Sequence, residues 1–205
     1  MLIKEIKPVT KDKQKYKVCL EGGADFILYR KELASYDLKE GMEVTEELYG
    51  EILEKTFIPR AKKRAMHLLE KMDRTEENLR SKLKENGYPA EAIDEAIAYV
   101  ESYRYVDDDR YANTYVRQYQ GKRSKSRIIR DLMQKGVDKE IIDKAIEEEY
   151  ESSEEDMIRE LLRKKGYDPE ENDPDRKQRE KMYRFLMGRG FKQADIIRVL
   201  NDPFA

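Results

Sequence analysis

The sequence predicts a mainly α-helical protein, with tandem three-helix repeat units in an elongated array after a small β-rich N-terminal unit. Apolar residues recur at helical spacing through most of the chain, which favours folding although 42% of the residues are charged. Alternating apolar residues near the start are typical of strands. A pattern centred on a glycine recurs three times in the rest of the chain, as in stacked helical repeats.

Residues 1–58 are expected to form the β-rich unit. Residues 2–9 contain a short apolar run, and apolar side chains alternate with polar ones over residues 16–20. The Gly22-Gly23 pair that follows predicts a turn. The extended pattern continues from Phe26 to Arg30, so strands are predicted up to that point.

A helix is expected to close this unit. Thr45 is followed by Glu46 and Glu47, the order of an N-cap and two first-turn acids that suit the positive end of a helix dipole. Pro59 is predicted to mark a boundary, after which the chain is helical. The repeat divides that remainder into residues 59–107, 108–151 and 152–205.

The repeat is centred on Gly87, Gly136 and Gly190, which are 49 and 54 residues apart. Five further positions around each glycine carry apolar side chains in all three copies. In the order of the copies, these are Leu79, Ile128 and Met182 eight residues before the glycine, Leu83, Leu132 and Leu186 four before, Tyr88, Val137 and Phe191 one after, Ile93, Ile142 and Ile196 six after, and Ile97, Ile146 and Leu200 ten after.

Each of these glycines is predicted to end a helix, because glycine adopts the left-handed conformation without a Cβ clash. In such a cap the residue after the glycine contacts the residue four before it. Thr75 and Ser124 are expected to be the N-caps of the helices that the first two glycines end, and Asp173 before Pro174 is expected in the third copy. A further helix precedes each pair, which completes the three-helix units.

The carboxylates of Asp107, Asp108 and Asp109 are the strongest candidates for a metal or catalytic cluster. Consecutive helix residues point in different directions, however, and a new helix is expected to begin here. Capping and first-turn roles for Asp108 and Asp109 are therefore favoured. His67 is expected on a helix surface and Cys19 in a strand, so no catalytic residue, metal or cofactor is predicted, and the chain is not expected to be an enzyme.

Residues 111–130 contain no acid, in a chain that has 44 acidic residues. This segment interleaves three tyrosines with six basic residues, which are Arg117, Lys122, Arg123, Lys125, Arg127 and Arg130. Such a patch attracts polyanions, and its aromatic side chains can stack or fill interface pockets. The alternative is a solvated face whose tyrosines belong to the core. Acids dominate residues 147–156, so a basic face beside an acidic one is expected, which suits a charge-patterned partner.

Composition points to a cytoplasmic, soluble protein that is expected to be a monomer. The formal net charge is −2, and the single cysteine excludes an internal disulfide. The start of the chain lacks the apolar core of a signal peptide, and no run is apolar enough to span a membrane. No membrane partner is therefore expected.

Three stretches resemble the bacterial RecX regulatory proteins. They are RTEENLRSKLKENGYPAEAIDEAIAYVESYRYVDDDRYANTYV, SRIIRDLMQKGVDKEIIDKAI and RKQREKMYRFLMGRGFKQADIIRVL. The resemblance covers roughly residues 60–202, with YVDDDRYA as its most specific part, and the β-rich unit resembles an extension found on some members. Arg104 departs from the family pattern, which often has glycine there, and a looser cap on the preceding helix is expected.

The resemblance implies a non-enzymatic modulator of RecA, the recombinase that forms filaments on single-stranded DNA. It implies binding in the filament groove and inhibition of strand exchange, ATP hydrolysis and co-protease activity, with a weak direct contact to DNA. The expected contact residues are the six basic residues of segment 111–130, with Arg184, Arg189 and Lys192 in the third unit. Two other classes stay open: a nucleic-acid-binding module that acts without RecA, and a nuclease that uses Asp107–Asp109 and needs magnesium.

Overall fold

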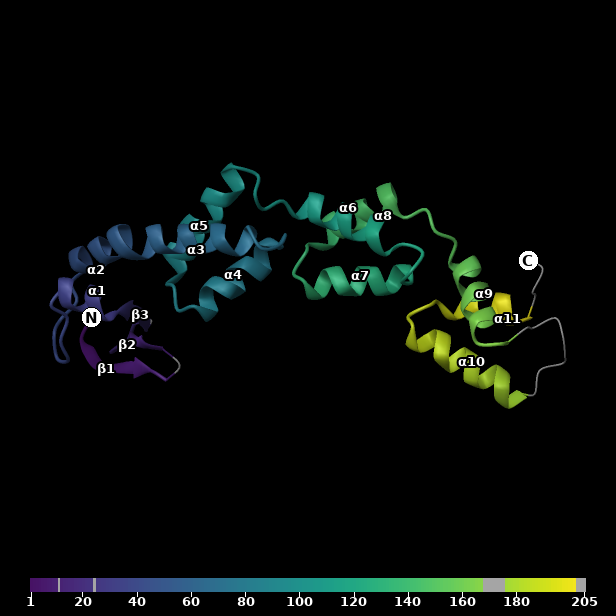
Figure 1. Ribbon diagram of the computed structural model, residues 1–205, viewed down its shortest axis with the longest axis horizontal. Helices are drawn as coiled ribbons and strands as arrows, with labels where there is room; N and C mark the ends of the chain where they lie inside the picture. Colours follow the sequence, from purple (N-terminus) through teal and green to yellow (C-terminus); the bar gives the residue numbers. More distant parts are fainter. Residues whose placement is uncertain (11, 24, 168–175, 202–205) are drawn as a thin grey trace. The chain divides into compact units, whose positions relative to one another are not determined.

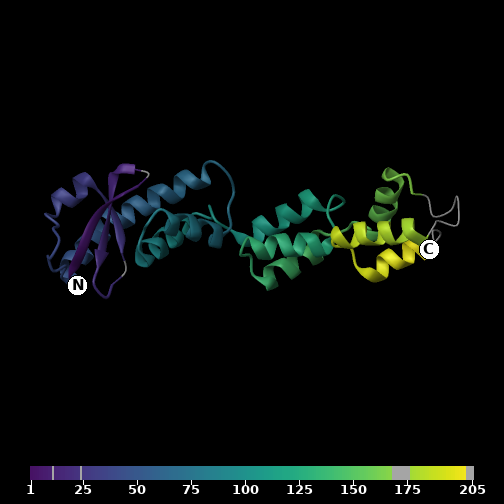
Figure 2. The same ribbon diagram turned by 90° about the horizontal axis from the view of Figure 1, so that it is seen from below.

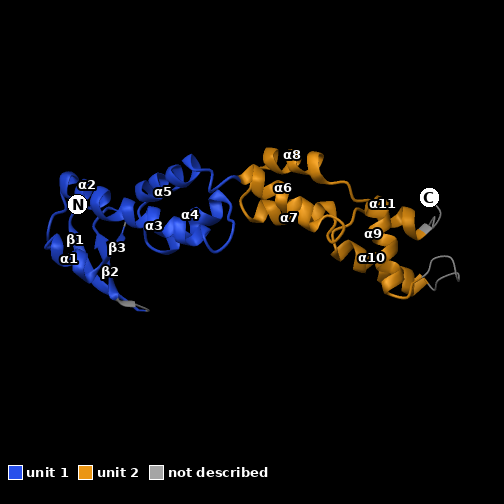
Figure 3. Ribbon diagram, turned by 45° about the horizontal axis from the view of Figure 1, so that its top comes forward, with its two compact units in different colours: residues 1–107 blue, residues 108–205 orange. Residues whose placement is uncertain are grey.

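A computed structural model describes residues 1–10, 12–23, 25–167 and 176–201 (Figure 1). The chain divides into unit 1, residues 1–107, and unit 2, residues 108–205 (Figure 3). Unit 1 contains the strands and the first helices, and unit 2 is helical in its described part. None of the described helices has the length and apolar character needed to cross a membrane.

An antiparallel sheet begins unit 1. Its strands β1 (Ile3–Val9), β2 (Asp12–Leu20) and β3 (Phe26–Tyr29) are adjacent in chain order. Val18 of β2 pairs with Phe26 of β3, and both side chains are fully buried. The strands predicted from the alternating apolar residues are therefore confirmed, and one face of the sheet supplies side chains to the core.

The extended conformation predicted up to Arg30 is wrong at its end, because Arg30 begins helix α1 (Arg30–Ser35). The backbone N–H of Tyr29 donates to Glu32 Oε2 at 2.7 Å. A side chain inside the first helical turn thus binds the last residue of the strand, as in a capping box. This contact starts a helix where the alternating pattern alone predicted more strand.

Helix α2 (Glu46–Ile52) begins as predicted, with Thr45 Oγ1 accepting a backbone N–H of the first turn at 3.2 Å. A π-helical segment η1 (Leu53–Phe57) and helix α3 (Ile58–Leu69) follow without a break. The boundary expected at Pro59 is therefore absent from the backbone, since Pro59 lies in the first turn of α3. Proline lacks the N–H of a helical ladder, and the wider π turn shifts that ladder just before it.

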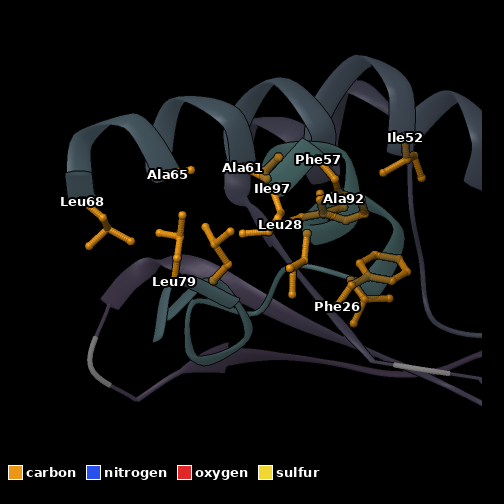
Figure 4. Close-up of a cluster of buried hydrophobic side chains, with 14 of the residues drawn as sticks. Phe26, Leu28, Ile52, Phe57, Ala61, Ala65, Leu68, Leu79, Ala92 and Ile97 are labelled. Atoms are coloured by element: carbon orange, nitrogen blue, oxygen red, sulfur yellow. The ribbon is translucent and has the colours of Figure 1, made fainter. Parts of the chain in front are cut away.

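One apolar core joins the sheet to the helices of unit 1 (Figure 4). Phe26 and Leu28 of β3 lie in the same cluster as Phe57, Leu79 and Ile97. The rings of Phe26 and Phe57 meet edge to face, with centroids 5.4 Å apart. Because these side chains come from the sheet and from several helices, the β-rich segment and the first repeat pack as one unit.

Arg60 of α3 strengthens this connection. Its guanidinium lies over the rings of Tyr29 and Tyr88, at 4.7 and 5.2 Å from their centroids. It also pairs with Glu32 at 2.5 Å and donates to the carbonyl of Ile27 at 3.1 Å. A planar guanidinium can stack and donate hydrogen bonds at the same time, so this one side chain links strand, loop and helix.

Three helices form each repeat (Figure 2). The groups are α3, α4 (Glu76–Glu85) and α5 (Ala90–Ser102); α6 (Asp108–Tyr119), α7 (Lys125–Gln134) and α8 (Lys139–Glu149); and α9 (Glu154–Lys164), α10 (Arg176–Gly188) and α11 (Gln193–Asn201). Gly87, Gly136 and Gly190 have φ angles of +81°, +83° and +87°. The next residue donates its N–H to the carbonyl of the leucine four before the glycine, at 3.2–3.4 Å. This is the cap geometry that the register predicts.

The N-caps predicted for the middle helices are present in the first two groups. Thr75 Oγ1 and Ser124 Oγ each accept a backbone N–H of the first turn, at 3.2 and 3.3 Å, and both residues are buried. Asp173 and Pro174, the pair expected in the third group, lie outside the described residues. Helix α10 is described from Arg176 onward.

Arg104 ends helix α5 in the left-handed conformation, with φ +55°. The N–H of Tyr105 donates to the carbonyl of Val100 at 2.9 Å, which is the same bond that follows the three repeat glycines. The cap is therefore closed rather than loosened. The left-handed conformation costs a residue with a Cβ roughly 1–2 kcal/mol.

Arg104→Gly is expected to be more stable than Arg104→Ala by about 1 kcal/mol. Both variants lose the arginine side chain and its interactions, whereas only alanine keeps a Cβ in the left-handed conformation. Urea unfolding of the two variants, followed by circular dichroism, measures the difference. Equal stability would show that Arg104 does not hold this conformation in solution.

Candidate functional site

Asp131 on α7 lies at the centre of the basic segment. Its Oδ2 is 2.6 Å from Nη1 of Arg123, and its Oδ1 is 3.0 Å from Nε of Arg127. The Asp131 side chain is only 9% exposed, whereas the two arginine side chains are 38% and 48% exposed. Two of the six predicted contact cations thus neutralise a buried carboxylate of their own chain.

Two tyrosines complete this Asp131 cluster, which consists of Tyr115, Tyr119, Arg123, Arg127 and Asp131. Arg123 Nη1 donates to the Tyr115 hydroxyl at 2.8 Å, and its guanidinium lies 4.0 Å from the Tyr119 ring centroid. Burial and the charge of Asp131 raise the pKa of Tyr115, so its hydroxyl stays protonated and donates to Asp131 at 3.4 Å. Stacking and hydrogen bonding together hold Arg123 in place.

The acidic run 147–156 pairs back onto the basic segment. Glu149 Oε2 is 3.0 Å from Arg117 Nε. Glu154 Oε1 accepts the backbone N–H of Lys125 at 2.7 Å and the hydroxyl of Tyr150 at 2.5 Å. Two acids of the expected acidic face thus bind groups of the neighbouring basic segment. Burial and the hydrogen bond to Glu154 raise the pKa of Tyr150, so that this hydroxyl remains a donor.

The third three-helix group also caps helix α7 of the second group. Ser124 Oγ, which caps α7 from within, donates its own hydrogen to the carbonyl of Arg189 at 3.0 Å. Glu154, the first residue of α9, accepts from Lys125 at the start of α7. Both contacts lie within unit 2, and they join its two groups at one helix terminus.

The remaining predicted cations are exposed to solvent. Lys122 and Arg130 in the second group have no ion pair within the described ranges, and the same holds for Lys192. Arg184 Nε donates to a carbonyl of its own helix at 3.4 Å, and Arg189 lies 5.0 Å from the ring centroid of Phe185. The charges of these five side chains, unlike those of Arg123 and Arg127, are not neutralised by an ion pair with a described residue.

Sequence reasoning missed Asp131 and Glu154. The i,i+4 spacing of Arg127 and Asp131 was a signal for their ion pair. Nothing local indicated that Asp131 is buried or that Arg123 reaches it. Glu154 was part of an acidic run, and its role at α7 depends on contacts 29 residues apart in the chain.

The candidates for metal or catalytic chemistry have separate local roles. Asp108 begins α6 and Asp109 follows in the first turn, where Asp109 Oδ1 is 3.0 Å from Lys144 Nζ. His67 is half exposed next to Glu70 on α3, and Cys19 is partly buried in β2. Within the described part of the chain, no three histidine, cysteine or acidic side chains are grouped so that they could hold a metal ion.

The fold and this surface define a tandem three-helix repeat protein whose candidate site is a charged surface. Sequence families described as the first, second and third three-helix domains of RecX match residues 61–99, 107–146 and 153–200. The chain belongs to the RecX family of regulatory proteins.

Individual relatives agree with this assignment. "Regulatory protein RecX" of Caldanaerobacter subterraneus subsp. tengcongensis is 33% identical, over 91% of this chain and 92% of its own length. The protein of the same name from Clostridium acetobutylicum is 30% identical over 99% and 96%. A crystal structure of regulatory protein RecX shares the fold with a TM-score of 0.61, at 24% identity and over 98% of both chains. RecX from Lactobacillus salivarius gives a TM-score of 0.56 at 21% identity, over 71% of this chain and 97% of that one.

Proposed function

We propose that this chain binds the RecA filament on single-stranded DNA and lowers its recombinase, ATPase and co-protease activities. The observation that carries the proposal is that the likeness to RecX includes all three three-helix domains in their order. RecX membership implies an interaction with RecA. The chain acts by docking as a cytoplasmic monomer, without metal, cofactor or catalysis of its own.

Docking is assigned first to Lys122 and Arg130, and then to Arg184, Arg189 and Lys192. Their charges are exposed, and exposed charges steer association with a polyanionic assembly. Arg117, Arg123, Lys125 and Arg127 border this surface, but their main contacts are with acids or rings of this chain.

The test of the proposal is a titration of RecA's DNA-dependent ATPase with this protein. A progressive fall in the ATPase rate at substoichiometric to equimolar protein is expected. An unchanged rate, with the protein shown to be folded, would contradict the proposal. A rise in rate would confirm docking but reverse the sign of regulation.

A nucleic-acid-binding module that acts without RecA is the second candidate. The exposed cations Lys122 and Arg130 favour it, because such charges attract the phosphate backbone of DNA with or without bound RecA. The two functions are distinguished by comparing the affinity of this protein for RecA–DNA filaments and for DNA alone at equal salt. RecA–DNA filaments should bind far more tightly than the same DNA alone; equal affinities would favour the second candidate.

Lys122→Gln/Arg130→Gln is expected to weaken filament binding roughly three- to tenfold at low salt, with a smaller difference as salt is raised. The fold should be unaffected, since neither side chain has an ion pair in the described residues. Lys63→Gln/Lys139→Gln removes the same charge from exposed positions elsewhere and serves as the matched control. Equal losses in both variants would mean that only the net charge matters.

A further inference from the structure

A cleft of about 520 Å³ lies within unit 2, between the loop after α6 and the helices α9 and α10. Met157 and Leu161 of α9 and Phe185 of α10 give it apolar walls. Its volume lies in the range of protein binding sites, at the size of a few side chains. Contact with a partner side chain would remove this apolar surface from water, which makes the free energy of binding more favourable.

The charged residues around the cleft are mostly basic. Lys164 and Glu160 pair with each other at 2.6 Å, so together they are neutral. Lys122, Lys165 and Arg189 also line the cleft, and none of them has a carboxylate partner in the described part of the chain. Three positive charges therefore border the apolar walls without internal compensation.

Two of these cations are held at the aromatic wall. Lys165 Nζ lies 5.3 Å from the Phe185 ring centroid, and the Arg189 guanidinium lies 5.0 Å from it. A cation beside an aromatic ring is stabilised there, yet its remaining hydrogen-bond donors stay available. The cleft thus presents ammonium and guanidinium donors next to apolar carbon.

We propose that this cleft binds an acidic peptide segment of a partner protein, with one large apolar side chain inserted between Met157, Leu161 and Phe185. Carboxylates on either side of the inserted residue meet Lys122, Lys165 and Arg189. A central apolar anchor with charged residues at the rim is the usual arrangement of a protein docking site. The inference shares Lys122 and Arg189 with the docking surface proposed above, but it requires neither RecA nor DNA.

Single-stranded nucleic acid fits the same cleft less well. Binding through stacking needs an open aromatic face, whereas the Phe185 ring already has two cations next to it. The Glu160–Lys164 ion pair is neutral and favours neither ligand. A peptide side chain can fill the space between Met157, Leu161 and Phe185 without needing a free ring face.

The probe is a fluorescein-labelled nonapeptide of alternating Asp and Glu with a single central Phe, and its binding to the full chain is measured by fluorescence anisotropy. Saturable binding is expected, and replacing the central Phe by Ser should weaken it about tenfold. Lys165→Gln/Arg189→Gln should weaken binding of the Phe peptide by a similar factor. These cations are exposed and bind no acid of the described chain, so the variant loses only their contacts with the Phe185 ring and should stay folded.

Arg163→Gln/Lys181→Gln is the matched control, because it removes one exposed cation outside the cleft from α9 and one from α10, the helices that Lys165 and Arg189 directly follow. It should bind the Phe peptide within about twofold of the parent. Equal binding of the Phe and Ser peptides, or equal losses in the two double variants, would overturn the proposal. Tighter binding of a short oligothymidylate, lost in Lys165→Gln/Arg189→Gln, would also overturn it and assign the cleft to nucleic acid.

Discussion

Arg123→Gln/Arg127→Gln is expected to lower the free energy of unfolding of unit 2 by roughly 1–3 kcal/mol. The substitutions leave the nearly buried Asp131 carboxylate without either of its cations. A buried charge that loses its partners is strongly destabilising, but both arginines are more than one-third exposed, so water compensates part of the loss. Urea unfolding of the variant and the parent, followed by circular dichroism, measures this difference.

Two further variants test whether the unpaired Asp131 charge causes this loss of stability. Arg130→Gln removes a neighbouring exposed cation of the same helix and should change stability by less than about 0.5 kcal/mol. Adding Asp131→Asn to the double variant removes the stranded charge, and more than half of the lost stability should return. A double variant as stable as the parent would mean that Asp131 is hydrated and that the Asp131 cluster is not structural. In the expected case, weaker RecA binding by this variant reports on folding and not on a contact.

Gly87→Ala is expected to destabilise unit 1 by about 2–4 kcal/mol. Two effects add at this position. Gly87 has φ +81°, where a Cβ is strained, and an added Cβ would lie 2.6 Å from Cγ1 and 3.0 Å from Cβ of Ile27 in β3. The second of those atoms is fixed to the strand backbone, so the sheet would have to move away from the helix cap. Thermal and urea unfolding of unit 1 would show the loss.

Gly166 provides the matched control for the steric effect. It ends α9 in the same way, with φ +65°, but an added Cβ would meet no atom of the described residues within 4 Å. Gly166→Ala should therefore lose only the strain, about 1 kcal/mol. Combining Gly87→Ala with Ile27→Ala should recover part of the loss if the clash contributes. Equal losses for the two glycines would leave backbone strain as the whole effect.

The repeat and its caps could be predicted because they depend on local contacts. Gly136 and Leu132 are four residues apart, and Ser124 contacts the first turn of its own helix, so spacing alone was sufficient. The continuation of the helix through Pro59 was not predictable in this way. It depends on the π-helical turn before it and on Arg60, whose partners come from β3, α1 and the α4–α5 turn.

The exposed charges of the proposed docking surface could be predicted only in part. The absence of acids from residues 111–130 correctly located exposed cations such as Lys122 and Arg130. The same count could not reveal that Asp131, one residue beyond the segment, is buried beneath Arg123 and Arg127. A sequence gives the number of charged residues in a segment, whereas their burial in the fold decides which of them a partner can contact.

The double capping of α7 has a consequence for how this chain tolerates changes in length. Ser124 and Lys125 are bound by Arg189 and Glu154, so the N-terminus of α7 completes its hydrogen bonds with atoms of the next repeat. Residues 150–153 connect the two groups and set the position of Glu154. An insertion or deletion there would move Glu154 away from Lys125 while leaving every helix intact. Repeat proteins gain stability from such contacts between neighbours. The length of this connector is therefore constrained, although the connector has no regular secondary structure.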